Sequence, residues 1–380
     1  MSSAIWITGP PASGRSVLAR AAAAELRAAG EPVVVLELDE IRAIVTPSPT
    51  CTDTEREVVY RALVYMAAAF AAAEMPVLID ATAHRRAWRD LARRLIARFA
   101  EVQVVCPMDG CREREPRRGA WHARRGIDEP AGLRGSVAPG AEVPYEPALR
   151  PELTIDPATE DRETAVRRIA DLVRRLRGPV ARATGDGAAS WAIWVTGLPG
   201  SGKTTLSRRA AETLAAAGAP VRVLEFSEFR RMVLGDLPES DATRDIVHRA
   251  LAYTAKLLAE SGVRVIVDAT APRRAWRRLA RELITHFAEV QLVCPSDVCG
   301  DRERAARWHL GLPQSCRPSE HPAPAPDLAL AYEGSLDAEL TLHTDPGGLA
   351  GNVEALLRLA QRLQHATASR GSAQQRSLAH

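Results

Sequence analysis

One loop of the sequence has residue types and a spacing suited to binding a chain of phosphates. Residues 197–205 read Gly-Leu-Pro-Gly-Ser-Gly-Lys-Thr-Thr, the pattern G-x-x-x-x-G-K-[ST]. Its glycines let successive backbone N–H groups face one phosphate, and a following helix adds the partial positive charge of its N-terminus. We predict that Lys203 contacts the β- and γ-phosphates of a nucleotide and that the Thr204 hydroxyl binds Mg²⁺. The candidate binding residues are Gly197, Leu198, Pro199, Gly200, Ser201, Gly202, Lys203, Thr204 and Thr205.

A related loop occurs earlier, where residues 9–16 read Gly-Pro-Pro-Ala-Ser-Gly-Arg-Ser. Arg15 stands where the other loop has Lys203. A guanidinium is bulkier than an ammonium, and its planar fork does not mimic a compact charge. The chain has only two lysines, and one of them is Lys203, so we expect the chemistry at that loop. The earlier loop is then either a weak nucleotide site or a catalytically inactive one, with the candidates Gly9, Gly14, Arg15 and Ser16.

An acidic residue follows the second predicted strand of the first half of the chain. Asp39 directly follows the predicted strand at 33–38, and Arg42 lies about one helical turn later. The Asp can accept the proton of an attacking hydroxyl or help to hold Mg²⁺, and the Arg can pair with an anionic substrate. In the second half, Ser227 replaces this Asp while Arg230 is kept.

Asp80 and Asp268 each end a third predicted strand. An acidic residue at this place in a phosphate-loop protein typically binds Mg²⁺ or its waters, and the alternative is that each caps the next helix. Asp268 is the candidate to replace the missing Asp of the second half, as base or as metal partner. The catalytic candidates are Lys203, Asp268, Asp39 and Asp80, and the metal candidates are Thr204 and Asp268.

Two further arginines repeat on the helix that follows each of these segments. Their five-residue spacing turns them about 140° apart on a helix, so they need not share a face. A solvated surface is the alternative to substrate binding. With Arg42 and Arg230, the candidate substrate-binding residues are Arg56, Arg61, Arg244 and Arg249.

The chain repeats itself with an offset of 188 residues. Residues 61–107 and 249–295 share 29 identities in 47 positions without a gap. A period this long indicates a duplicated domain rather than a solenoid repeat. We expect a first copy at 3–176, a linker at 177–190, a second copy at 191–363 and a disordered tail at 364–380.

Each copy alternates predicted strands and helices, which favours an α/β fold with a parallel sheet. The sequence thus predicts two tandem P-loop kinase domains, each a parallel sheet flanked by helices. In the first copy the expected strands are 4–8, 33–38, 77–80 and 102–106, and the expected helices are 16–29, 54–73, 88–99 and 163–176.

Composition excludes several classes of protein. The net charge of +3 over 380 residues is too small for dedicated nucleic-acid binding. No apolar run is long enough to cross a membrane, and no signal peptide begins the chain. Six cysteines form no disulfide framework, so we expect a reduced cytoplasm. The expected partner is a small nucleotide substrate, and a homodimer or a pairing of the two copies stays open.

Together these residues resemble the adenylylsulfate (APS) kinase family. That family combines a P-loop, an Asp-x-x-Arg segment and an arginine-bearing helix. Residues 99–107 and 287–295 match its strand that leads to a Cys-Pro turn, residues 111–119 match its Cys-x-x-Arg segment, and residues 144–156 match its Pro-Tyr-Glu segment. The resemblance covers nearly all of the first copy and the second copy to about residue 302.

The resemblance implies transfer of the γ-phosphoryl group of ATP, with Mg²⁺, to the 3′-hydroxyl of adenylylsulfate, giving PAPS and ADP in sulfate assimilation. Two departures bear on the acceptor. The Ser-Pro that the family often carries is Ala83-His84 and Ala271-Pro272 here, and the second copy keeps only fragments of the lid segment. The alternatives are a kinase for another hydroxyl, on a metabolite or a polynucleotide end, and a non-catalytic nucleotide-binding regulator.

Overall fold

The chain forms two compact units, one mainly of Met1–Thr184 and the other mainly of Gly185–His380. The computed structural model describes residues 2–105, 144–177, 190–309, 330–344 and 348–377. Most of the expected linker, residues 178–189, therefore lies outside the described residues. Within the described part of the chain, no helix is both long enough and apolar enough to span a membrane.

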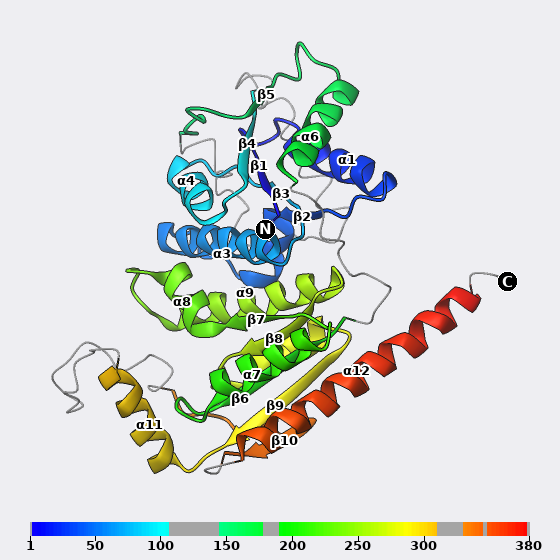
Figure 1. Ribbon diagram of the computed structural model, residues 1–380. Coiled ribbons are helices and arrows are strands. Elements are labelled where there is room, and N and C mark those ends of the chain that lie inside the picture. Colours follow the sequence, from blue (N-terminus) through cyan, green and yellow to red (C-terminus); the bar gives the residue numbers. More distant parts are fainter. Residues whose placement is uncertain (1, 106–143, 178–189, 310–329, 345–347, 378–380) are drawn as a thin grey trace. The chain divides into compact units, whose positions relative to one another are not determined.

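Unit 1 is built on a five-stranded sheet in the order β2-β3-β1-β4-β5 (Figure 1), and every strand pairs in parallel with its neighbour. Parallel neighbours need crossover connections, and helices form those that link β1, β2, β3 and β4 along the chain. The elements are β1 (Ala4–Thr8), α1 (Arg15–Ala28), β2 (Val34–Glu37), α2 (Leu38–Val45), α3 (Asp53–Ala72), β3 (Val77–Asp80), α4 (Arg86–Leu95), β4 (Phe99–Val104), β5 (Leu153–Ile155) and α6 (Arg162–Leu176).

Unit 2 repeats this topology with the order β7-β8-β6-β9-β10, again parallel throughout. Its elements are β6 (Ala192–Gly197), α7 (Lys203–Ala216), β7 (Val221–Glu225), α8 (Phe226–Leu234), α9 (Asp241–Glu260), β8 (Arg264–Asp268), α10 (Arg274–Leu283), β9 (Phe287–Val293), α11 (Ser296–His309), β10 (Leu340–His343) and α12 (Leu349–Ser377). The predicted fold class, two tandem α/β domains with parallel sheets flanked by helices, is confirmed.

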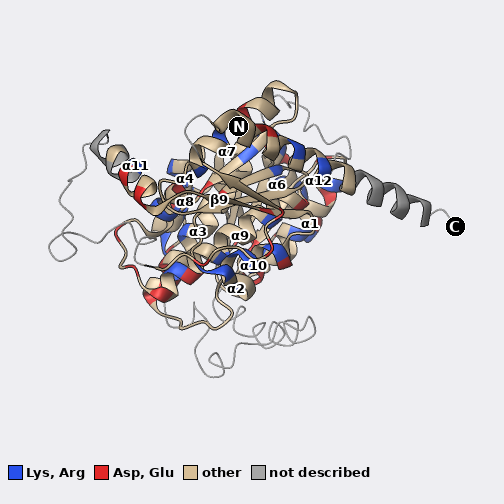
Figure 2. Cartoon of the chain, turned by 90° about the horizontal axis from the view of Figure 1, so that it is seen from below, with Lys and Arg blue, Asp and Glu red and all other residues tan. Residues whose placement is uncertain are grey.

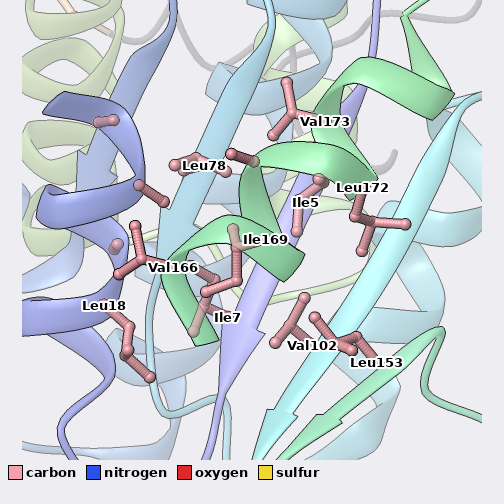
Figure 3. Packing of buried hydrophobic residues seen from close by; sticks show 14 of the residues in the cluster. Ile5, Ile7, Leu18, Leu78, Val102, Leu153, Val166, Ile169, Leu172 and Val173 are labelled. Carbon is pink, nitrogen blue, oxygen red and sulfur yellow. The ribbon is translucent and has the colours of Figure 1, made fainter. Parts of the chain in front are cut away.

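The central strand of unit 1 explains why both faces of the sheet are covered. All five residues of β1 are buried, so alternate side chains enter two different layers. Ile5 and Ile7 pack against α1 and α6, beside Leu18 and Ile169 (Figure 3). Trp6 points to the other face, where its indole N–H donates to the Ala81 carbonyl.

A buried ion pair recurs in both units. Arg89 is fully buried and its Nε donates to Glu101 in β4 at 2.5 Å, and Arg277 pairs in the same way with Glu289 in β9 at 2.9 Å. Each guanidinium also donates to backbone carbonyls of two separate loops, which for Arg277 are those of Ala271 and Glu333. The arginine therefore holds the loop after the third strand of its unit to the segment before the last strand.

One of the expected helix boundaries is wrong. Helix α4 ends at Leu95, and Phe99 begins β4 instead of ending the helix. No glycine or proline marks this change, and the nearly continuous burial of residues 99–104 does not by itself distinguish a strand from the end of a buried helix. The backbone of α12 runs past Gln364 to Ser377, and the disorder expected for the tail stays a prediction.

Basic and acidic residues are interspersed along the helices rather than separated by sign (Figure 2). This distribution agrees with the near balance of 50 basic and 47 acidic residues.

Replacing Arg277 by Met should lower the free energy of unfolding of unit 2 by about 3–5 kcal/mol, because Glu289 is left as a buried charge without its partner. Chemical denaturation followed by hydrogen exchange of the β8 and β9 amides measures the loss. Arg278→Ala is the control, since the Arg278 side chain is 79% exposed and pairs with Glu282 on its own helix. Equal stability of the two variants would contradict the role given to Arg277.

Candidate active site

The two phosphate loops have nearly the same backbone. Gly197 and Gly202 have φ angles of 149° and 93°, and Gly9 and Gly14 have 156° and 95°. A Cβ built on Gly197 would lie 2.6 Å from the Leu292 carbonyl oxygen, so this position needs glycine to bring the loop against the neighbouring strand. Sequence reasoning predicted both loops, and each connects a central strand to a long helix.

The loop of unit 2 brings together the predicted side chains. Thr204 Oγ1 donates to Asp268 Oδ2 at 2.5 Å, and Lys203 Nζ donates to the Gly197 and Leu198 carbonyls at 3.0 and 2.9 Å. Burial raises the pKa of Asp268, while Lys203 and Thr204 act in the opposite direction. A hydroxyl and a carboxylate at adjacent positions are oxygen donors of the kind that Mg²⁺ prefers, so these residues fit the metal.

The loop of unit 1 is arranged differently. Arg15 donates from Nη1 to Asp80 Oδ1 at 2.9 Å and from Nη2 to Thr82 Oγ1 at 2.8 Å. Both partners of the ion pair are buried, with side chains 9% and 6% exposed. Burial raises the pKa of Asp80, and the Arg15 guanidinium opposes that rise. The cation that balances this carboxylate is thus part of the chain, so unit 1 does not fit a divalent metal at Asp80.

The capping alternative for the two strand-end aspartates is wrong. Helix α4 begins at Arg86 with Arg85 as its N-cap, and α10 begins at Arg274 with Arg273 as its N-cap. Both aspartates instead face their own phosphate loop, as the hydrogen bonds above show.

The acceptor-side candidates of unit 1 lie at the same edge of the sheet. Asp39 stands in the first turn of α2, directly after β2, whose last residue Glu37 pairs in register with Asp80. Burial raises the pKa of Tyr60, and the nearby Arg42 and Arg15 lower it. Asp39 raises the pKa of Tyr60 and that of Asp80. The Asp-x-x-Arg segment therefore begins at the carboxyl edge of the sheet, next to the strand that ends at Asp80.

The helix arginines of the two units separate into two kinds. Arg61 and Arg249 pair with carboxylates one turn earlier on their own helices, with Glu57 at 2.8 Å and with Asp245 at 2.5 Å. Arg56 pairs with the exposed Asp53 at 3.3 Å.

Arg244 pairs with the exposed Asp241 at 3.1 Å and also meets Glu239 at 3.3 Å. The five-residue spacing has put the two arginines of each helix in different surroundings. Their roles in substrate binding stay predictions.

The family model for adenylylsulphate kinase matches residues 1–156 and 189–311, roughly three quarters of the chain. The chain belongs to the adenylylsulphate kinase family. The two matched segments agree with the tandem copies, and the chain is a P-loop kinase of this family, whose members use ATP as a substrate.

Curated relatives of the family match about one copy at a time. An adenylyl-sulfate kinase of Synechococcus sp. (strain JA-3-3Ab) is 39% identical over 140 residues, which cover 34% of this chain and 80% of the relative. Another, from Picosynechococcus sp. (strain ATCC 27264 / PCC 7002 / PR-6), is 31% identical over 175 residues, covering 46% and 96%. The structure of the Mycobacterium tuberculosis APS kinase in complex with AMPPNP and APS is similar with 26% identity and a TM-score of 0.37, covering 46% of this chain and 99% of that one.

The Pro-Tyr-Glu segment that carries part of the adenylylsulphate kinase resemblance has a structural role here. Tyr145 OH lies 3.1 Å from Thr8 Oγ1 at the end of β1, and Tyr332 OH lies 3.2 Å from Thr196 Oγ1 in unit 2. The segment is therefore anchored at the edge where the phosphate loop begins. The Cys-x-x-Arg match at residues 111–119 lies outside the described residues.

Sequence reasoning missed an aromatic stack beside each site. Tyr60 stacks on Trp88 with ring centroids 3.9 Å apart, and His248 stacks on Trp276 at 3.7 Å. Burial lowers the pKa of His248 to about 4, so this ring is neutral at pH 7. The signal was present in the repeat, because Tyr60 and His248 are 188 residues apart.

Changing either loop cation should change the number of nucleotide sites that depend on Mg²⁺. Arg15→Lys removes the guanidinium that pairs with Asp80, and Lys203→Arg brings one within reach of Asp268. Calorimetric titration with ATP in the presence and absence of Mg²⁺ should find one Mg²⁺-dependent site per native chain, two in the first variant and none in the second.

The matched control is Arg209→Lys, because the Arg209 side chain is 67% exposed and pairs with Glu212 on its own helix. An Arg15→Lys chain that still binds one Mg²⁺-dependent ATP would contradict the role given to the Arg15–Asp80 pair.

Proposed function

We propose that unit 2 transfers the γ-phosphoryl group of ATP to the 3′-hydroxyl of adenylylsulfate, giving PAPS and ADP. The observation that carries the proposal is the complete phosphate loop in which Lys203 stands beside the hydrogen-bonded pair Thr204 and Asp268. Membership of the adenylylsulphate kinase family supports the acceptor, as do relatives that carry that name.

In the proposed reaction, the acceptor oxygen forms a bond to the γ-phosphorus while the bond from that phosphorus to the β–γ bridging oxygen breaks. The bridging oxygen leaves with ADP, and the hydroxyl proton passes to a base. The loop N–H groups and Lys203 stabilise negative charge on the phosphates. Mg²⁺, held by Thr204 and Asp268, would supply further charge neutralisation. Asp268 serves either as the metal partner or as the base, because Ser227 replaces Asp39.

Unit 1 is proposed to be the non-catalytic copy. Its phosphate loop keeps the backbone curl, but the Arg15 guanidinium already neutralises Asp80. This arrangement favours nucleotide binding or regulation over phosphoryl transfer in unit 1, which is the second function that the geometry supports. A different hydroxyl acceptor for unit 2, on a metabolite or a polynucleotide end, is the remaining alternative.

Lys203→Ala should abolish phosphoryl transfer, lowering kcat by at least about 100-fold, because the cation that stabilises the transferring group is lost. Steady-state release of ADP in the presence of adenylylsulfate measures the effect, and circular dichroism shows whether the fold is kept. Lys256→Ala, the only other lysine change available, is the control, since Lys256 pairs with the exposed Glu260 on α9. Undiminished transfer in the Lys203 variant would exclude unit 2 as the catalytic unit.

A panel of acceptors tests the substrate. Purified full-length protein should release ADP with adenylylsulfate and far more slowly with sugars, nucleosides and polynucleotide 5′ ends. The Lys203→Ala chain provides the background for every acceptor. Faster turnover with another member of the panel would identify that compound as the acceptor instead of adenylylsulfate. ATP binding without any acceptor-dependent ADP release would favour a non-catalytic nucleotide-binding regulator.

A further inference from the structure

Three charged side chains of unit 2 form a compact group on the acceptor side of the sheet. Arg230 in α8 donates to Glu239 from Nε at 3.2 Å and from Nη2 at 2.8 Å. Arg244 in α9 brings its Nε to 3.3 Å from Glu239 Oε1. The Arg230, Glu239 and Arg244 side chains are 31%, 17% and 19% exposed. One carboxylate is thus held by two guanidiniums at a partly accessible place.

Both arginines are among the six that the sequence analysis names as candidates for substrate binding. Helix α8 begins directly after Glu225, whose register partner is Asp268. One turn beyond Arg244 on α9, His248 lies against Phe226, the first residue of α8, with ring centroids 4.4 Å apart. The group is therefore close to the carboxyl edge of the sheet, where the phosphate loop and Asp268 stand.

A carboxylate in a bidentate bond to a guanidinium occupies the geometry that sulfate or phosphate oxygens of a ligand would use. Arg230 offers Nε and Nη2 in parallel, and both are engaged by Glu239. An anionic group of a ligand that binds to Arg230 and Arg244 therefore competes with the carboxylate of Glu239, which also carries a negative charge. An uncharged part of a ligand meets no such competition.

Unit 1 lacks this carboxylate. The residue that aligns with Glu239 at the repeat offset is Cys51, and the arginines that align with Arg230 and Arg244 are Arg42 and Arg56. Among the residues that the structure describes, Arg42 makes no ion pair, and Arg56 pairs with Asp53, which is 69% exposed. The internal carboxylate is a feature of the unit with the complete phosphate loop.

We propose that Glu239 is a specificity-determining residue of unit 2. Its carboxylate takes the place of the acceptor's anionic group at Arg230 and Arg244, so an anionic acceptor has to displace it, whereas an acceptor without a charge at this place does not. The inference rests on the proposed function, in which unit 2 phosphorylates a hydroxyl acceptor.

Glu239→Gln keeps the shape of the side chain and removes its charge, and Glu239→Cys installs the residue of unit 1. Either change should lower KM for adenylylsulfate about tenfold, the equivalent of losing one charge-assisted hydrogen bond, and leave KM for ATP unchanged. Glu212→Gln is the control, because Glu212 pairs with Arg209 at the surface of α7, where both side chains are more than 60% exposed. An unchanged or raised KM for adenylylsulfate in both Glu239 variants would overturn the proposal.

Binding without turnover separates this inference from the proposed function. Calorimetric titration of adenylylsulfate into Lys203→Ala and into Lys203→Ala/Glu239→Gln should show about tenfold tighter binding to the double variant. If no variant phosphorylates adenylylsulfate, the proposed function fails, and tighter binding to the double variant still upholds the role of Glu239. If the native chain phosphorylates adenylylsulfate and both titrations give the same affinity, the proposed function stands and the inference fails.

Discussion

The buried carboxylate at the end of the third strand of each unit is the constraint on which the rest of the site depends. Asp80 and Asp268 are each 6% exposed, and a charge in such surroundings requires a cation or hydrogen bonds to its oxygens. Unit 1 meets the requirement with the guanidinium of Arg15, and unit 2 meets it with Thr204 and the nearby charge of Lys203. The residue at the position of Arg15 and Lys203 therefore decides whether a side chain of the protein neutralises the carboxylate or whether the carboxylate remains suited to a metal.

The framework around these carboxylates is the same in both units, so the differences at the site are changes in chemistry rather than in fold. The buried pairs Arg89–Glu101 and Arg277–Glu289 join the same strands and loops. The tyrosine that anchors the segment before the last strand is also repeated. Within this shared framework, Glu239 of unit 2 places a negative charge where an anionic ligand would otherwise bind. Arg15 of unit 1 places a positive charge where a cation would otherwise bind.

Much of the fold could be predicted from residue patterns because its signals are local. The glycine spacing, the apolar strands and the repeat offset identify the phosphate loops, the parallel sheets and the duplication, and adenylylsulphate kinase membership agrees with the residues quoted for it. Boundaries without glycine or proline were less visible, as at Phe99, where a strand begins instead of a helix ending.

The sequence by itself determined that the chain carries two copies of one phosphate-binding fold and that the copies differ at the loop cation and at the acceptor-side Asp. These are properties of residue type and spacing, and they can be read along the chain. Only the tertiary structure decided which charges meet. Arg15 reaches Asp80 across 65 residues, and Glu239 is held by arginines from two different helices. The reason is that ion pairing depends on distances between side chains of separate elements, which the packing of helices on the sheet sets and the linear order of residues does not.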